Sequence, residues 1–183
     1  MSKENADKEQ KRSFKREVFS WIECIVVTIL LTEFILNFVI INANIPSGSM
    51  ENTIMTNDKL IALRTSYWFN DPKRGDIIIF KYPDDETEWF IKRVIALPGE
   101  TVLVKDGKVY INGSKKALSE PYIKEEPVED FGPYKVPKNG YFVMGDNRNN
   151  SNDAREWETH YVSRDEVLGK AWFRYYPSIK VIK

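Results

Sequence analysis

One serine and one lysine of this chain stand in surroundings that could make each of them reactive. Ser49 lies in the turn-forming segment PSGSM (residues 46–50), close behind a long apolar run. Lys92 lies in residues 89–98, an apolar segment typical of a β-strand. A serine hydroxyl needs a neighbouring base to act as a nucleophile, and a desolvated lysine can replace the usual histidine. The pair indicates a serine protease, although PSGS is also ordinary turn chemistry.

The surroundings of Lys92 decide whether it could act as a base. Strand alternation predicts that Phe90, Lys92 and Val94 share one face, with Arg93 on the other. Burial between apolar neighbours disfavours the ammonium form and lowers the pKa of a lysine, as a general base requires. Arginine cannot serve, because it stays protonated in proteins. The alternative is a lysine that extends from a sheet edge into solvent.

Composition narrows the function classes. The 183 residues include 27 basic and 27 acidic side chains, a balance that gives no indication of nucleic-acid binding. Cys24 is the single cysteine, so a disulfide within the chain is excluded, and His160 is the single histidine. Zinc sites of the usual kind need several such ligands, and no loop has calcium-binding spacing, so we expect no metal.

Residues 19–41 form an apolar run close to the ~20 residues that span a bilayer. A cleaved signal peptide would have a shorter run, so we expect a retained transmembrane anchor. Glu33 and Asn37 interrupt the run, and a buried core helix is the alternative. Basic residues concentrate before the run, at positions 3, 8, 11, 12, 15 and 16. The positive-inside rule therefore predicts a cytoplasmic segment at residues 1–18 and an exported domain at residues 42–183.

The exported part has mainly the periodicity of strands. The clearest pattern is residues 102–112, where Asp106-Gly107 suits a two-residue type I′ hairpin. Residues 164–168 could form one helical turn, and residues 114–138, rich in Lys, Glu and Pro, read as a long excursion from the β core. Further strands are expected at residues 59–64, 76–82, 141–144 and 171–176.

Three segments in order resemble the motifs of the type I signal peptidases, specifically the Gram-positive form with a single N-terminal anchor. They are PSGSM (46–50), KRVIALPGE (92–100) and GDNRNNSNDAR (145–155), and the resemblance covers essentially the whole chain. It implies a mostly β fold, in which the N-terminal transmembrane helix is followed by an antiparallel coiled β-barrel catalytic domain. It also implies cleavage of exported precursors after small residues at −1 and −3, without a cofactor.

The resemblance assigns roles to individual residues. Ser49 would be the nucleophile and Lys92 the general base, while the Ser49 N–H and the Ser47 hydroxyl would form the oxyanion hole. Ser151 would orient the lysine. Charged residues of the third motif would support the site, namely Asp146, Arg148, Asp153 and Arg155. We also expect Ile45 and Met50, which flank the serine motif, to line the substrate pocket, with signal peptides and the lipid membrane as partners.

Two rival hypotheses stay open at this point. One is a self-cleaving repressor-type protease with a similar dyad, against which the anchor and the lack of a DNA-binding segment argue. The other is a membrane-tethered, non-catalytic or weakened β module that binds exported chains. Its support is Ala154, where the family usually has a serine, and the chain also departs from the family pattern at Asn52 and Glu158.

Overall fold

The computed structural model describes residues 3–182, and side chains from residue 14 onward. It divides into two compact units, residues 1–39 and 40–183, which are described separately. The first comprises the helix α1 (Lys3–Phe34) and a π-helical turn, η1 (Ile35–Val39). Residues 14–39 form the one helix in the described chain that is long and apolar enough to cross a membrane. The predicted cytoplasmic segment, residues 1–18, lies partly outside the described residues.

The apolar helix ends two residues earlier than the sequence indicated. Ile40 and Ile41, predicted as the end of the anchor, instead begin strand β1 (Ile40–Asn44) and pair with β2. Within the helix, the Asn37 side-chain amide donates to the Glu33 carbonyl (2.8 Å) and carboxylate (3.0 Å). The two polar residues of the apolar run are therefore hydrogen-bonded to each other. A side chain that hydrogen-bonds to a helix carbonyl can distort the helix locally, and Asn37 lies within the π-helical turn η1.

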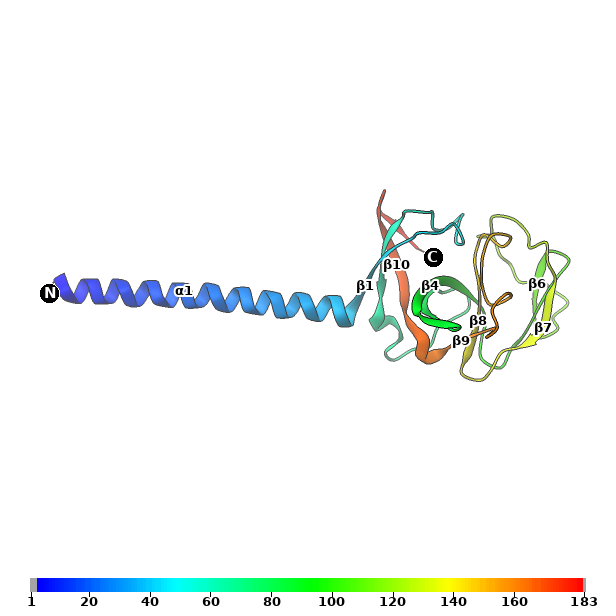
Figure 1. Cartoon of the computed structure of the whole chain (residues 1–183), viewed down its shortest axis with the longest axis horizontal. Coiled ribbons are helices and arrows are strands. Elements are labelled where there is room, and N and C mark those ends of the chain that lie inside the picture. Colours follow the sequence, from blue (N-terminus) through cyan, green and yellow to red (C-terminus); the bar gives the residue numbers. More distant parts are fainter. Residues whose placement is uncertain (1–2, 183) are drawn as a thin grey trace. The chain divides into compact units, whose positions relative to one another are not determined.

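The second unit is built on an antiparallel sheet with the strand order β1-β2-β10-β3-β4-β8-β9, and β11 pairs with β10. Figure 1 labels β1, β10, β4, β8 and β9 of this sheet. Its further strands are β2 (Lys59–Leu63), β3 (Ile77–Tyr82), β4 (Asp85–Ala96), β8 (Gly140–Met144), β9 (Val162–Ser163), β10 (Val167–Tyr176) and β11 (Lys180–Val181). The mostly β prediction is confirmed. The described pairings do not return from β9 to β1, so closure into a barrel is not confirmed.

A smaller sheet has the order β6-β5-β7, from β5 (Thr101–Lys105), β6 (Lys108–Ile111) and β7 (Phe131–Lys135). Asp106 (φ 50°) and Gly107 (φ 74°) both have positive φ, as a type I′ turn requires, so the predicted hairpin is confirmed. The predicted excursion, residues 114–138, is only partly irregular, because β7 pairs with β5. Two 3₁₀ turns, η2 (Arg64–Tyr67) and η3 (Arg164–Glu166), complete the unit.

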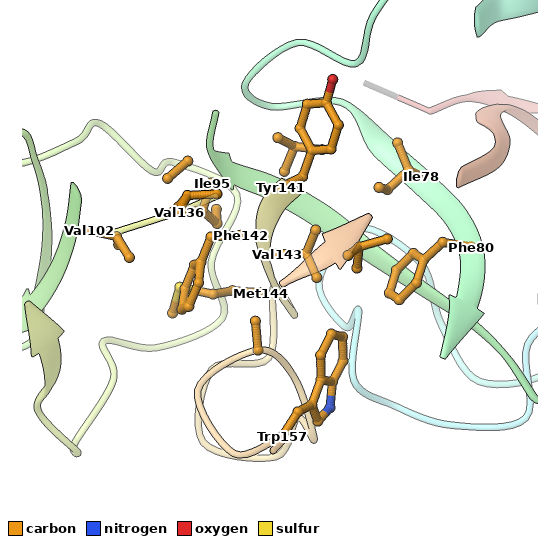
Figure 2. Close-up of a cluster of buried hydrophobic side chains, with 14 of the residues drawn as sticks. Ile78, Phe80, Ile95, Val102, Val136, Tyr141, Phe142, Val143, Met144 and Trp157 are labelled. Atoms are coloured by element: carbon orange, nitrogen blue, oxygen red, sulfur yellow. The ribbon is translucent and has the colours of Figure 1, made fainter. Parts of the chain in front are cut away.

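Strand β8 is buried on both faces and anchors the core that supports the site. Figure 2 shows Phe142 and Met144 directed toward Val102, while Val143 lies on the side of Phe80. Side chains alternate across a strand, so a strand covered on both faces reads as a continuous apolar run, as YFVM (141–144) does. The third motif begins at the end of β8, so this packing fixes where its loop starts.

Candidate active site

Three segments far apart in the sequence line one cleft of about 840 Å³. One is the turn that carries Ser49, the second is the part of β4 that leads to Lys92, and the third is the loop that follows β8. The lining residues are Ile45, Pro46, Ser47, Gly48, Ser49, Glu88, Trp89, Phe90, Ile91, Lys92, Asn149, Asn150, Ser151, Asn152 and Glu156. The cleft therefore gathers residues of all three sequence motifs.

Ser49 and Lys92 are in direct contact. Lys92 Nζ donates to Ser49 Oγ at 2.9 Å, and the two residues are only 4% and 7% exposed, respectively. Burial lowers the pKa of Lys92 from 10.5 to about 8, against the opposing effect of the Asp153 carboxylate. An amine whose pKa is lowered to about 8 and which contacts a hydroxyl can accept the hydroxyl proton, which is the chemistry of a general base.

The neighbours of Lys92 in the sheet explain why its side chain is buried. Lys92 lies in β4 opposite Ile78 of β3, and its Nζ is 5.2 Å from the centre of the Phe90 ring. Phe90 in turn stacks on Tyr82, with ring centres 4.5 Å apart. The stacked rings of Phe90 and Tyr82 cover one side of the amine. Burial of the amine affects its pKa more than the Asp153 carboxylate does.

Asp153 influences the amine without pairing with it. Its carboxylate accepts hydrogen bonds from the Gly145 N–H (2.9 Å) and the Ser151 hydroxyl (2.8 Å), and it forms an ion pair with Arg155 (2.9 Å). Arg155 also donates to the Arg148 carbonyl (2.6 Å). Asp153 raises the pKa of Lys92, but this effect is smaller than the lowering by burial. The supporting role of Asp153 and Arg155 that the resemblance implies stays a prediction.

Ser151 lines the cleft, but its observed hydrogen bond goes to Asp153. Within residues 3–182 we find no hydrogen bond between Ser151 and Lys92, so the lysine-orienting role stays a prediction. Gly145 has no side chain, and this allows Ser151 and the Ser49 carbonyl group to lie close to its backbone. A Cβ at that position would lie 2.2 Å from Ser151 Oγ and 2.4 Å from the Ser49 carbonyl oxygen, so no larger residue fits without a shift.

The turn around Ser49 places its predicted neighbours differently. Ser47 Oγ lies 3.5 Å from Ser49 Oγ, at the limit of a hydrogen bond, and Ile45 lines the cleft. Met50 does not: it is fully buried in an apolar core with Ile54. The Ile54 N–H donates to the Met50 carbonyl at 2.9 Å, so the chain turns helically after Ser49 and directs Met50 inward. The pocket assignment of Met50 is therefore corrected.

Two buried ion pairs hold the loop after β8. Asp146 accepts two hydrogen bonds from Arg93 (2.8 and 2.7 Å), which ties the loop to β4. Arg148 donates twice to Glu120 (3.0 and 2.6 Å), which ties it to the segment before β7. Bidentate pairs of this kind combine charge with fixed geometry. Sequence reasoning placed Asp146 and Arg148 near the site but missed Glu120, since nothing distinguishes it among the Glu residues of residues 114–138.

The departure at Ala154 leaves no gap in the cleft. Ala154 is fully buried in the same apolar cluster as Trp157 and Val143. A methyl group suits that environment better than a hydroxyl, which would need a partner. The observation that favoured a non-catalytic module therefore concerns the core and not the cleft.

His160 lies outside the residues that line the cleft. Its Nδ1 is 2.8 Å from the Ala154 carbonyl oxygen, and its ring packs edge-on against Phe131 and Tyr134, with centres 5.2 and 5.4 Å apart. The single histidine is thus engaged elsewhere, and Lys92 is the basic group beside Ser49.

Comparisons with known proteins identify the family of the chain. The sequence model of the family described as signal peptidase, peptidase S26, matches residues 18–176. A probable signal peptidase I-2 of Synechocystis sp. is 42% identical over 170 residues, or 88% of this chain and 76% of that protein. A signal peptidase I of Bacillus amyloliquefaciens is 34% identical over 184 residues, or 95% of this chain and 96% of that protein.

Among solved structures, a signal peptidase I of Enterococcus faecalis is 36% identical and covers 55% of this chain and 97% of its own, with a TM-score of 0.48. The family match, from residue 18 to residue 176, includes most of the apolar helix and all three motifs. The chain therefore belongs to the S26 signal peptidases and is a type I signal peptidase.

Proposed function

We propose that this chain is a membrane-anchored serine endopeptidase that cleaves exported preproteins after small residues, with Ser49 as the nucleophile and Lys92 as the general base. The observation that carries the proposal is the 2.9 Å contact between a hydroxyl and a buried amine inside a cleft. The pKa of about 8 leaves a useful fraction of Lys92 neutral at physiological pH. No other basic side chain lines the cleft in the described chain.

The reaction proceeds in two stages. Neutral Lys92 accepts the Ser49 proton as Ser49 Oγ bonds to the scissile carbonyl carbon, and a tetrahedral oxyanion forms. The resulting ammonium returns the proton to the leaving amine as the C–N bond breaks. A water molecule then attacks the acyl carbon while Lys92 accepts its proton. As the bond from the acyl carbon to Ser49 Oγ breaks, Lys92 returns this proton to Ser49 Oγ, and the acid product leaves.

The substrate would bind as an extended strand along β4. On the side that faces β8, pairing covers only Arg93 to Ala96. No strand of the described residues pairs with that edge between Asp85 and Lys92, and residues 88–91 line the cleft. A peptide that adds to this edge gains main-chain hydrogen bonds, while alternate side chains enter pockets. Ile45, at the other wall of the cleft, would favour small apolar side chains.

A precursor peptide tests the function directly. We expect the purified full-length chain in detergent to cut a peptide with an Ala-x-Ala site at one bond, because small side chains fit a shallow cleft. The same peptide with Phe at −1 should be cut at least about 100-fold more slowly, a loss typical of a side chain that does not fit its pocket. Mass spectrometry of the products measures both. Tight binding of the first peptide without cleavage would instead favour the non-catalytic module.

The oxyanion hole yields a separate prediction. We expect Ser47→Ala to fold normally and to lose about 100-fold in kcat, because one of two donors to the oxyanion is removed. KM should change little, since the charge develops only in the transition state. Steady-state kinetics on the precursor peptide measure both constants. An unchanged kcat would mean that Ser47 serves only the turn.

We further propose that the N-terminal segment is cytoplasmic and that the domain from about residue 42 is extracytoplasmic. The basis is the cluster of basic residues before the apolar helix. A protease added to intact cells without an outer barrier should degrade the domain, and an antibody tag at the N-terminus should stay protected until the membrane is opened. Protection of the domain would reverse the orientation.

A further inference from the structure

Asn147 touches both peptide groups that flank the nucleophile. Its side-chain amide donates to the Gly48 carbonyl at 3.0 Å, and its backbone N–H donates to the Ser49 carbonyl at 3.0 Å. Asn147 is 1% exposed and does not line the cleft, so it approaches Ser49 from the protein side. One residue of the third motif thus holds the chain immediately before and immediately after the nucleophile.

The planarity of the peptide bond turns this contact into a constraint on a catalytic group. The Gly48 carbonyl and the Ser49 N–H belong to one trans peptide unit and point in opposite directions. Fixing the carbonyl on the side of Asn147 therefore directs the Ser49 N–H away from Asn147. Among the described residues we find no protein acceptor for the Ser49 N–H, and Ser49 lines the cleft. A hydrogen bond to the carbonyl also polarises the peptide and strengthens its N–H as a donor.

The orientation of the Asn147 side chain leaves one of its polar atoms without a hydrogen bond. Its Oδ1 is buried without a hydrogen-bond partner among the described residues. Rotating the amide would bring Oδ1 against the Gly48 carbonyl, and two acceptors would then repel each other. A buried acceptor without a partner is uncommon in folded proteins. In this orientation Oδ1 has no hydrogen bond, and the side-chain N–H donates to the Gly48 carbonyl.

We propose that Asn147 is a positioning residue for the oxyanion hole: it orients the Gly48–Ser49 peptide so that the Ser49 N–H meets the developing oxyanion. This inference rests on the proposed function and adds a residue that acts through the backbone of the nucleophile. The Glu51 N–H also donates to the Gly48 carbonyl, at 3.1 Å, and it remains in every variant of Asn147. Removing the side-chain donor should thus loosen the peptide without releasing the turn.

The test uses two variants of similar shape. Asn147→Leu removes both polar atoms, and Asn147→Asp keeps the shape but places an acceptor against the Gly48 carbonyl. We expect each to lower kcat about 100-fold, as for the loss of one oxyanion donor, with KM within about threefold. Values are compared on the high-pH plateau, so that an altered pKa of Lys92 in Asn147→Asp does not enter. Asn42→Leu is the control, because it removes one exposed hydrogen bond, to Tyr175, outside the cleft.

A second measurement separates positioning from a general loss of structure. A peptide aldehyde forms a hemiacetal with Ser49, and its oxygen then occupies the oxyanion hole. Its affinity should fall about 100-fold in both Asn147 variants, in step with kcat/KM. The uncleaved precursor peptide should keep its affinity in the Ser49→Ala background with or without the Asn147 change, because ground-state binding does not use the hole.

The outcomes are distinct. Unchanged plateau kcat in both variants overturns the role of Asn147, and so does an equal loss of aldehyde and precursor affinity, which indicates a structural effect. Thermal unfolding of each variant confirms that a folded enzyme is measured, and if Asn147→Leu does not fold, Asn147→Asp alone decides. Failure of the unmodified chain to cut the peptide, or cutting by Ser49→Ala, contradicts the proposed function instead.

Discussion

Ser49→Ala and Lys92→Met are each expected to lower kcat by roughly 10⁴-fold or more, because the two groups act as one catalytic unit. The 2.9 Å contact means that either change removes the proton transfer that activates the hydroxyl. The double variant should therefore lose little more than either single one. Initial rates on the precursor peptide, followed over hours for the weak variants, measure the losses.

Two further variants sharpen this prediction. Lys92→Arg should be as inactive as Lys92→Met, since a guanidinium stays protonated and cannot accept the Ser49 proton. Lys81→Met is the matched control: it makes the same change on the neighbouring strand β3, where Lys81 forms an exposed ion pair with Glu86 at 3.1 Å. That pair contributes little to stability, so activity should be unchanged. Substantial turnover by any of the three dyad variants would refute the assignment of Ser49 and Lys92.

The strand that carries Lys92 was predictable because its information is local. Alternation in residues 89–98 placed Lys92 beside Phe90 and Arg93 on the other face. The structure confirms this, since Lys92 Nζ lies near the Phe90 ring while Arg93 pairs with Asp146. The type I′ hairpin was predictable for the same reason, because Asp-Gly favours positive φ at both positions.

What the sequence did not reveal depends on long-range contacts. The partner of Arg148 is Glu120, and the two meet only because the segment before β7 folds back on the loop after β8. Met50 follows Ser49 directly, yet the helical turn behind it directs it into the core. The role of Asn147 depends on the path of the Ser49 turn in space, which no spacing in the sequence encodes. The sequence pattern singled out the serine and the lysine that the structure brings into contact, but not all of the residues that surround them.

The pH dependence of cleavage is expected to follow the ionisation of Lys92. Burial lowers the pKa of this amine to about 8, and the neutral form is the base. kcat/KM should therefore rise about tenfold per pH unit below that value and level off above it. At pH 5 only about one enzyme in a thousand would carry the neutral amine, so activity should be about a thousandfold below the plateau. Measuring kcat/KM from pH 5 to pH 10 at constant ionic strength gives the curve.

His160→Gln identifies the group that titrates. The unperturbed pKa of histidine is about 6.5, so ionisation of His160 could also produce a limb, that is, a rise of kcat/KM with pH, near neutral pH. Its ring packs on Phe131 and Tyr134 and lies outside the lining of the cleft, so the variant should keep both the limb and the plateau. Glutamine retains an amide that can donate to the Ala154 carbonyl, which preserves the local hydrogen bond. Loss of the limb in His160→Gln would transfer the base to histidine, and a limb near 10 would mean that Lys92 titrates as an ordinary exposed lysine.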